Sequence, residues 1–174
     1  PASRFWEAFQ YVHEAFLPKT VHAGEAYGPE SIFQALTELH ADRIGHGYFL
    51  FDEDRIKSRR IKNKPDYIAN LAQYIADRRI TIEICLTSHL QTNPALTNIA
   101  DHNFSKMLRH KLSTTFCTDN RTVSKTSVTN EIMHALQNFP LSEKTFRNCI
   151  IQGFKRSFFP GNYLTKRKYV RQCI

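Results

Sequence analysis

The sequence lacks the segments that carry a chain into or across a membrane. Among its 174 residues there is no run of about eighteen apolar residues, the length that a helix needs to span a bilayer. The first ten residues contain no basic stretch followed by an apolar one, so they do not have the pattern of a secretory signal. We therefore expect a soluble, globular protein with no membrane partner.

Cysteine is scarce and is never paired at a metal-binding spacing. Cys85, Cys117, Cys149 and Cys173 form no Cys-x-x-Cys motif, which excludes a zinc ribbon and a thioredoxin-type redox motif. Cys85 and Cys117 lie in apolar, strand-like runs, so we predict that they are buried thiols. So few cysteines in a chain of this length do not indicate a disulfide framework. The sequence therefore favours a reducing compartment, and we predict the cytoplasm.

Three common catalytic motifs are absent as well. There is no Gly-x-Ser-x-Gly sequence, which argues against a serine hydrolase with a nucleophile elbow. There is no His-Glu-x-x-His helix of the zinc proteases and no glycine-rich loop of the kind that binds phosphates.

The net charge is +8, but the basic residues follow no nucleic-acid-binding motif. The denser groups, at residues 55–64 and near the C-terminus, are expected to form a solvated surface. A basic nucleic-acid binder stays a weak alternative, and we expect no nucleic-acid partner.

The sequence does contain a regular alternation of β-branched stretches with amphipathic helices. A helix is predicted first, over residues 3–16, with Phe5, Phe9, Val12 and Phe16 at helical spacing. Strands are predicted at residues 19–25, 41–50, 80–88 and 112–120, and helices after them at residues 28–40, 65–79, 102–111 and 126–139. Two further helices are predicted at residues 141–159 and 161–172. Strands that alternate with helices indicate right-handed crossovers and a parallel sheet, an α/β fold.

Polar and ionisable residues gather where the predicted strands end. The four strand ends are followed by His22 and Glu25, by His46, by Ser88 and His89, and by Asp119 and Asn120. In parallel α/β folds, ligands and catalytic groups collect at the carboxyl ends of the strands. The sequence therefore predicts one functional rim built from four strands.

These residue types suit more than one kind of site. His22 and Asp119 are ordinary zinc ligands, and Glu25 can move protons around a metal-bound water. Zinc with an open position needs three protein ligands, so His46 is either a further ligand or the group that positions the attacking water. Alternatively, Glu25, His46 and Asp119 form an acid–base set without a metal. Structural roles also stay open, since Asp-Asn is a common turn pair and a glutamate near a helix start complements the helix dipole.

Four stretches of the chain resemble the adenosine deaminase family of metal-dependent amidohydrolases. They are TVHAGEAYGPESI, ADRIGHG, IEICLTSHLQT and TDN, and the resemblance runs from about Phe5 to Phe159. It implies a (β/α)8 barrel, a Zn2+ cofactor and a small-molecule purine nucleoside as substrate. The implied reaction is hydrolytic deamination, with adenosine converted to inosine and ammonia.

The resemblance also implies a role for four of the residues at the rim. His22 matches a zinc-binding histidine of the family, and Asp119 matches its zinc-binding aspartate. Glu25 matches the proton donor to N1 of the purine, and His46 matches the histidine that orients and deprotonates the zinc-bound water. A carboxyl that donates a proton near neutral pH needs a raised pKa, which a poorly solvated pocket can supply.

Three further positions bear on the substrate. Gly24 is the glycine between metal ligand and acid, where the backbone allows close approach. Asn120 replaces a second aspartate that in many members hydrogen-bonds N7 of the purine, and an amide can still donate there. His89 stands where the family usually has asparagine, and the resemblance gives it no role.

The family's His-x-His motif, which supplies two more zinc ligands from the first barrel strand, is absent. A full barrel takes about 250 residues, and this chain has four strand–helix units. The resemblance therefore implies the C-terminal half of the barrel, about strands five to eight. We expect residues 1–174 to be a single partial catalytic domain that begins part-way through a longer protein, because no methionine starts the chain.

The missing N-terminal half is the partner that we expect, and without it the chain should have no deaminase activity. Two other functions stay open. The chain could be a non-catalytic half-barrel remnant, or its substrate could be adenine or AMP, because much of the ribose and phosphate contact would come from the missing half.

Overall fold

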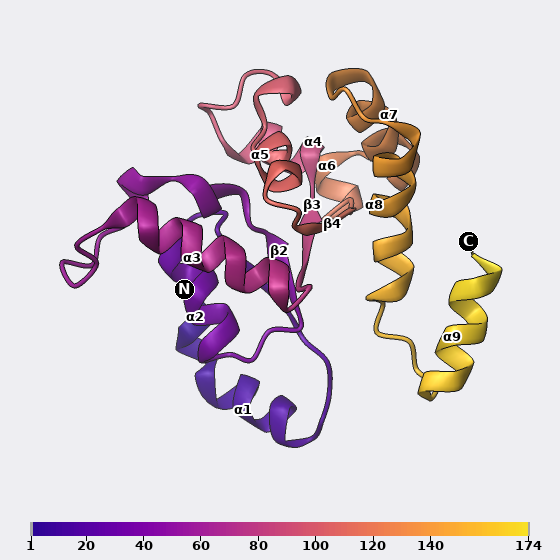
Figure 1. The fold of residues 1–174 in the computed structure, drawn as a ribbon, viewed down its shortest axis with the longest axis horizontal. Coiled ribbons are helices and arrows are strands. Elements are labelled where there is room, and N and C mark those ends of the chain that lie inside the picture. The colour runs from indigo at the N-terminus through magenta and orange to yellow at the C-terminus, as the bar shows by residue number, and fades with distance from the viewer. Residues whose placement is uncertain (1, 174) are drawn as a thin grey trace.

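The computed structural model describes residues 2–173, and its centre is a sheet of four parallel strands in the order β1-β2-β3-β4. The strands are β1 (Thr20–Ala23), β2 (Arg43–His46), β3 (Thr81–Ile84) and β4 (Ser113–Phe116). Helix α2 (Pro29–Thr37) packs against β1 at one end of the sheet, and α8 (Glu143–Lys155) packs against β4 at the other, with α3 (Lys64–Asp77) beside α2 (Figure 1). The predicted parallel α/β fold is confirmed.

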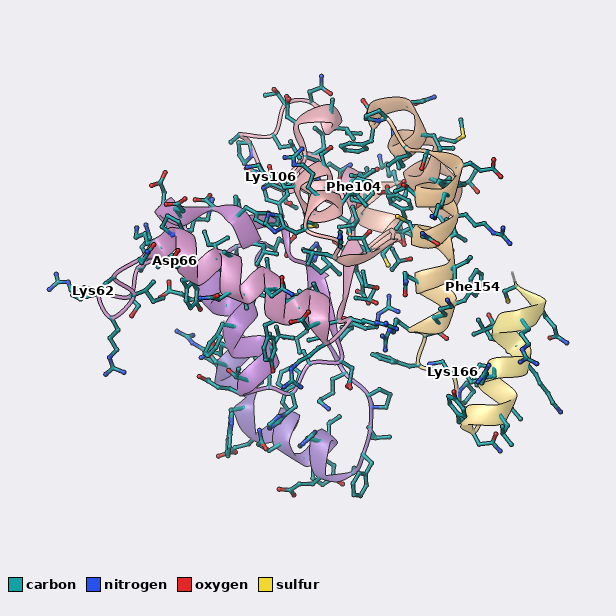
Figure 2. The ribbon with its side chains drawn as sticks, in the orientation of Figure 1. Lys62, Asp66, Phe104, Lys106, Phe154 and Lys166 are labelled. Atoms are coloured by element: carbon teal, nitrogen blue, oxygen red, sulfur yellow. The ribbon has the colours of Figure 1, made fainter. Side chains whose placement is uncertain are left out.

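Further helices complete the chain. They are α1 (Trp6–Glu14), α4 (Leu86–Thr92), α5 (Phe104–Arg109), α6 (Arg121–Ser124), α7 (Val128–Asn138) and α9 (Tyr163–Gln172), with 3-10 turns η1 (Ala2–Phe5), η2 (Tyr48–Phe51), η3 (Glu53–Arg55) and η4 (Ile99–Asp101). The C-terminal α9 lies outside α8, away from the sheet (Figure 1). Phe154 projects from α8 toward α9, where its ring lies 6.1 Å from that of Tyr169 (Figure 2).

All four predicted strands end earlier than the sequence suggested, and two of the differences have a clear cause. The strand predicted at residues 80–88 ends at Ile84, and the buried residue Leu86 begins α4 instead. An apolar run does not distinguish a buried strand from a buried helix, which explains the error. The strand predicted at residues 41–50 ends at His46, because Gly47 has a φ of 58° and turns the chain into η2.

The core lies between the sheet and the helices that cover it. The predicted apolar faces of α2 and α3 are buried; their residues are Ile32, Leu36, Leu39, Ile68, Leu71 and Ile75. The stripe of the first helix is different. Phe5 and Phe16 are 66% and 95% exposed, and only Phe9 packs partly against the core. Helical spacing predicts that an apolar face exists, but it does not say what covers that face.

The surface and cysteine predictions can be checked directly. Of the six basic residues at positions 55–64, four are exposed, and Lys62 projects from the loop before α3 into solvent (Figure 2). All four cysteines are unpaired, with Cys85 buried as predicted and Cys117 half-buried. Between residues 2 and 173, each helix is too short or too polar to cross a bilayer.

A largely buried ion pair ties the sheet together at the strand starts. Arg43 of β2 places its Nε 2.6 Å from Oε1 of Glu83 on β3, and the two side chains are 11% and 16% exposed. The guanidinium also donates to the carbonyl of Arg156, 3.1 Å away at the end of α8. One side chain therefore joins β2, β3 and the last sheet-packing helix.

We expect the substitution Arg43→Met to lower the free energy of unfolding by about 3–5 kcal/mol, because it leaves the carboxylate of Glu83 buried without a partner. Adding Glu83→Leu should recover much of that loss, since an apolar pair can replace a buried ion pair. Urea unfolding of both single variants and the double variant measures this. A double variant less stable than R43M would contradict the explanation.

Candidate functional site

The register of β1 against β2 brings His22 and His46 together. His22 lies opposite Gly45, and Ala23 lies opposite His46. A Cβ atom at Gly45 would lie 2.8 Å from Cδ2 of His22, so glycine leaves room for the imidazole. The two rings meet edge to face with centroids 4.6 Å apart, and Nε2 of His46 lies 3.2 Å from Nδ1 of His22.

Gly24 shapes the turn that follows β1. Its φ is 69°, its N–H donates to Oγ of Ser31 at 2.9 Å, and its carbonyl accepts from the N–H of Phe49 at 2.7 Å. A Cβ atom there would lie 2.6 Å from Cδ1 of Ile32. Backbone conformation and packing therefore both require glycine between His22 and Glu25.

We expect Gly24→Ala to destabilise the fold by about 1–3 kcal/mol, because it combines a positive φ with a clash in the core. Shortening the neighbour in G24A/I32V should remove part of the clash and leave the backbone strain. Thermal and urea unfolding of G24A, I32V and the double variant would show this. Additive losses in the double variant would mean that the two sites do not touch.

Glu25 lies beside His46 in a partly enclosed position. Its Oε2 is 3.3 Å from Nε2 of His46, and its side chain is 29% exposed. Burial raises the pKa of the Glu25 carboxyl; His22 opposes the shift and the negative charge of Asp119 adds to it. The direction of this shift is the one that favours a proton donor. Glu25 also lines two neighbouring hollows, of about 290 Å³ and 270 Å³.

The loop after β4 brings a second carboxylate to the same place. Asp119 has a φ of 55°, and its Oδ2 accepts a hydrogen bond from Oγ of Ser88 at 2.7 Å. Asn120 caps α6, where its Oδ1 accepts from the N–H of Val123 at 3.1 Å. The acceptor oxygen of Asn120 is thus used by the helix, and its NH2 group is the part that can donate to a ligand.

The donor atoms suit a zinc ion. One ligand atom each from His22, His46 and Asp119 lie within 4.8 Å of one another. Imidazole nitrogen and carboxylate oxygen are ordinary zinc ligands, and tetrahedral zinc is bound at about 2.0–2.2 Å from such atoms. The described residues therefore offer two or three ligands of a metal centre, according to the role of His46.

Two more histidines lie behind His46. Nδ1 of His46 is 3.0 Å from Nε2 of His89, and Nδ1 of His89 is 2.7 Å from Nε2 of His102. All three rings are buried. Burial lowers the pKa of His46 to about 4 and of His102 to about 3, and it lowers the pKa of His89 well below the ordinary value. The three rings are therefore neutral near pH 7.

His102 is a site residue that the sequence reasoning did not single out. It lies in the loop between η4 and α5, far from any predicted strand end, and no motif marks it.

Glu131 of α7 is a second site residue that the sequence reasoning did not single out. It is fully buried, and it accepts hydrogen bonds from the N–H of Thr87 at 3.2 Å and from Oγ1 of Thr126 at 2.8 Å. Glu131 thereby holds the start of α4, which carries Ser88 and His89.

The buried histidines make stability depend on pH. The ordinary pKa of His102 is 6.5, and its pKa in the fold is about 3. Between these values the unfolded chain binds more protons than the folded one. The free energy of unfolding should therefore fall as the pH drops below about 6.5, by about 1.4 kcal/mol per pH unit for each such histidine.

The matched control is His102→Asn, whose side-chain oxygen can still accept from the backbone but does not titrate. We expect the free energy of unfolding of this variant to fall less steeply as the pH drops. The difference in slope should be about 1.4 kcal/mol per pH unit, the contribution of one histidine. Urea unfolding between about pH 7.5 and about pH 5.5 measures both slopes. Equal slopes in the two proteins would contradict a neutral, buried His102.

Comparison with known proteins places this chain in a family. A family model described as adenosine deaminase matches residues 1–170. An adenosine deaminase from Mycobacterium avium is 34% identical over 160 residues, which cover 92% of this chain and 43% of that protein.

Solved structures share the fold. An amidohydrolase from Burkholderia ambifaria, with bound Zn, has a TM-score of 0.79 at 22% identity, over 97% of this chain and 43% of that one. The N6-mAMP deaminase of Arabidopsis has a TM-score of 0.74 at 28% identity, over 99% of this chain and 45% of that one. The predicted half of a (β/α)8 barrel is thus confirmed, and the chain spans less than half the length of the relatives it matches. The chain belongs to the adenosine deaminase family.

Proposed function

We propose that this chain supplies one part of the active site of a zinc-dependent deaminase that converts adenosine to inosine and ammonia. The observation that carries the proposal is the meeting of His22, Glu25, His46 and Asp119 at one end of the sheet. Membership of the adenosine deaminase family supports the reaction class. The proposed domain is partial, with the rest of the site on another part of the barrel.

His22 and Asp119 would hold the zinc, and the bound Zn of the Burkholderia ambifaria neighbour supports this metal. When bound, zinc lowers the pKa of a water molecule toward about 7 and so supplies the nucleophile. The hydrogen bond from Ser88 fixes Asp119 through Oδ2. Two protein ligands do not complete a catalytic zinc shell, so other ligands must come from outside residues 1–174.

Glu25 and Asn120 would act on the purine. The reaction adds water at C6 and releases the 6-amino group as ammonia. Glu25, whose carboxyl has a pKa raised by burial, would donate a proton to N1 and so make C6 more electrophilic. The NH2 group of Asn120 donates to N7, while its oxygen stays with α6. His46, next to Glu25, orients the attacking water.

The partner that we propose is the N-terminal half of the barrel. Within the described residues β1 pairs with β2 alone, so its other edge offers backbone groups to a further strand. The neighbouring α1 has no buried residue; Phe5 just before it and Trp6 at its start are 66% and 51% exposed. An open strand edge next to exposed aromatic side chains is what a missing half-barrel would cover.

We expect the purified 174-residue chain to release no ammonia from adenosine, and a protein completed with a half-barrel that carries a His-x-His strand to do so. In the completed protein, Glu25→Gln should lower kcat by about 10²- to 10⁴-fold, because an amide cannot donate the proton. Glu38→Gln, at an exposed glutamate of the same chain, is the matched control. Zinc content and ammonia release are the readouts.

The alternatives give different results in that experiment. Turnover by the 174-residue chain alone would contradict the partial site. Absence of both zinc and turnover in the completed protein would favour a non-catalytic half-barrel. AMP is the second candidate substrate, because Arg55 lines the same hollow as Glu25 and the Arabidopsis neighbour is an N6-mAMP deaminase. Comparing kcat/KM for adenosine, adenine and AMP decides between the substrates.

A further inference from the structure

The hydrogen bonds behind His46 begin at a group that can only donate. The N–H of Phe104 is the first of α5 and has no partner within the helix, as is usual for the first turn. It donates to Nδ1 of His102 at 2.9 Å. A backbone N–H cannot accept, so Nδ1 of His102 must be the unprotonated nitrogen of that ring.

This fixed end sets the direction of every bond that follows. A neutral imidazole has one donor and one acceptor nitrogen, so His102 carries its proton on Nε2 and donates to Nδ1 of His89, 2.7 Å away. His89 then carries its proton on Nε2 and donates to Nδ1 of His46, 3.0 Å away. The remaining proton of His46 therefore lies on Nε2. Two acceptors are within reach of it, Nδ1 of His22 at 3.2 Å and Oε2 of Glu25 at 3.3 Å.

The surroundings keep these rings uncharged and in place. His46 and His89 are 1% exposed and His102 is 2% exposed. The ring of Tyr48 packs against His89 and His102, with centroids 5.0 Å and 4.9 Å away. Burial disfavours the charged form of each imidazole, which agrees with their lowered pKa values. The reverse direction would place the N–H of Phe104 against a second N–H.

We propose that His89 and His102 are positioning residues that hold His46 as a hydrogen-bond donor through Nε2. His89 donates to Nδ1 of His46, and this leaves the proton of His46 on the side of the ring that faces Glu25 and His22. This assignment rests on the proposed function and deepens it, since it names the residues that orient His46 beside Glu25.

The direct test is nuclear magnetic resonance of the 174-residue chain, labelled with 15N and freed of metal. Couplings across the hydrogen bonds should join protonated Nε2 of His102 to Nδ1 of His89, and protonated Nε2 of His89 to Nδ1 of His46. Protons on Nδ1 of His89 or His46, or the loss of both couplings in a folded chain, would overturn the proposal. The measurement needs neither zinc nor substrate, so it does not depend on whether the deaminase proposal is correct.

Substitutions at His89 separate positioning from packing. H89L has a side chain that cannot donate, and should abolish the coupling to His46. H89Q has an amide that reaches about as far as Nε2 of the imidazole, and should keep Nδ1 of His46 as an acceptor. H134Q, on α7 outside this set of rings, is the control. If H89L does not fold, the couplings in the unsubstituted chain still decide the direction.

Activity of the completed protein gives the second readout. H89L should lower kcat by about 10- to 100-fold with little change in KM, the usual cost of losing an orienting partner, and H89Q should restore most of it. Equal activity of H89L, H89Q and H134Q would show that His89 does not act through His46.

Discussion

The parallel register of β1 with β2 is the constraint on which the site depends. It sets His22 opposite Gly45 and Ala23 opposite His46, so that the two imidazoles leave neighbouring strands one residue apart in the register. Gly45 leaves the space that the ring of His22 occupies, and Gly24 allows the turn that returns Glu25 to His46. A slip of one residue in this pairing would remove Gly45 from beside His22 and turn the strand side chains to the opposite face of the sheet. The arrangement of the site residues therefore depends on how the four short strands pair.

A second set of contacts, behind the strand ends, fixes the orientation of His46. The chain of hydrogen bonds from Phe104 through His102 and His89 joins the first turn of α5 to the centre of the rim. Glu131 of α7 holds α4, and α4 carries two members of the site. The helices after β3 and β4 thus do more than cover the sheet, because they fix the orientation of groups on β2 and beside β4.

The rim could be predicted from the sequence because strand ends and motif residues are local features. His22, Glu25, His46 and Asp119 each follow a β-branched run, and the structure brings all four together. The turn of the chain at Leu86 could not be predicted, since an apolar run continues through it and is buried in either conformation. His102 could not be predicted either, because its partner His89 is contacted through the fold and no spacing in the sequence indicates it. The exposed face of α1 shows the same limit, since helical spacing does not indicate what packs on a face.

The central proposal is that His22 and Asp119 bind the metal and that His46 donates a hydrogen bond beside it. The number of imidazole ligands on zinc, counted by X-ray absorption spectroscopy of the zinc-loaded 174-residue chain and of its H46Q variant, tests this most directly. The account predicts one imidazole, from His22, in both proteins. A second imidazole that disappears in H46Q would contradict it.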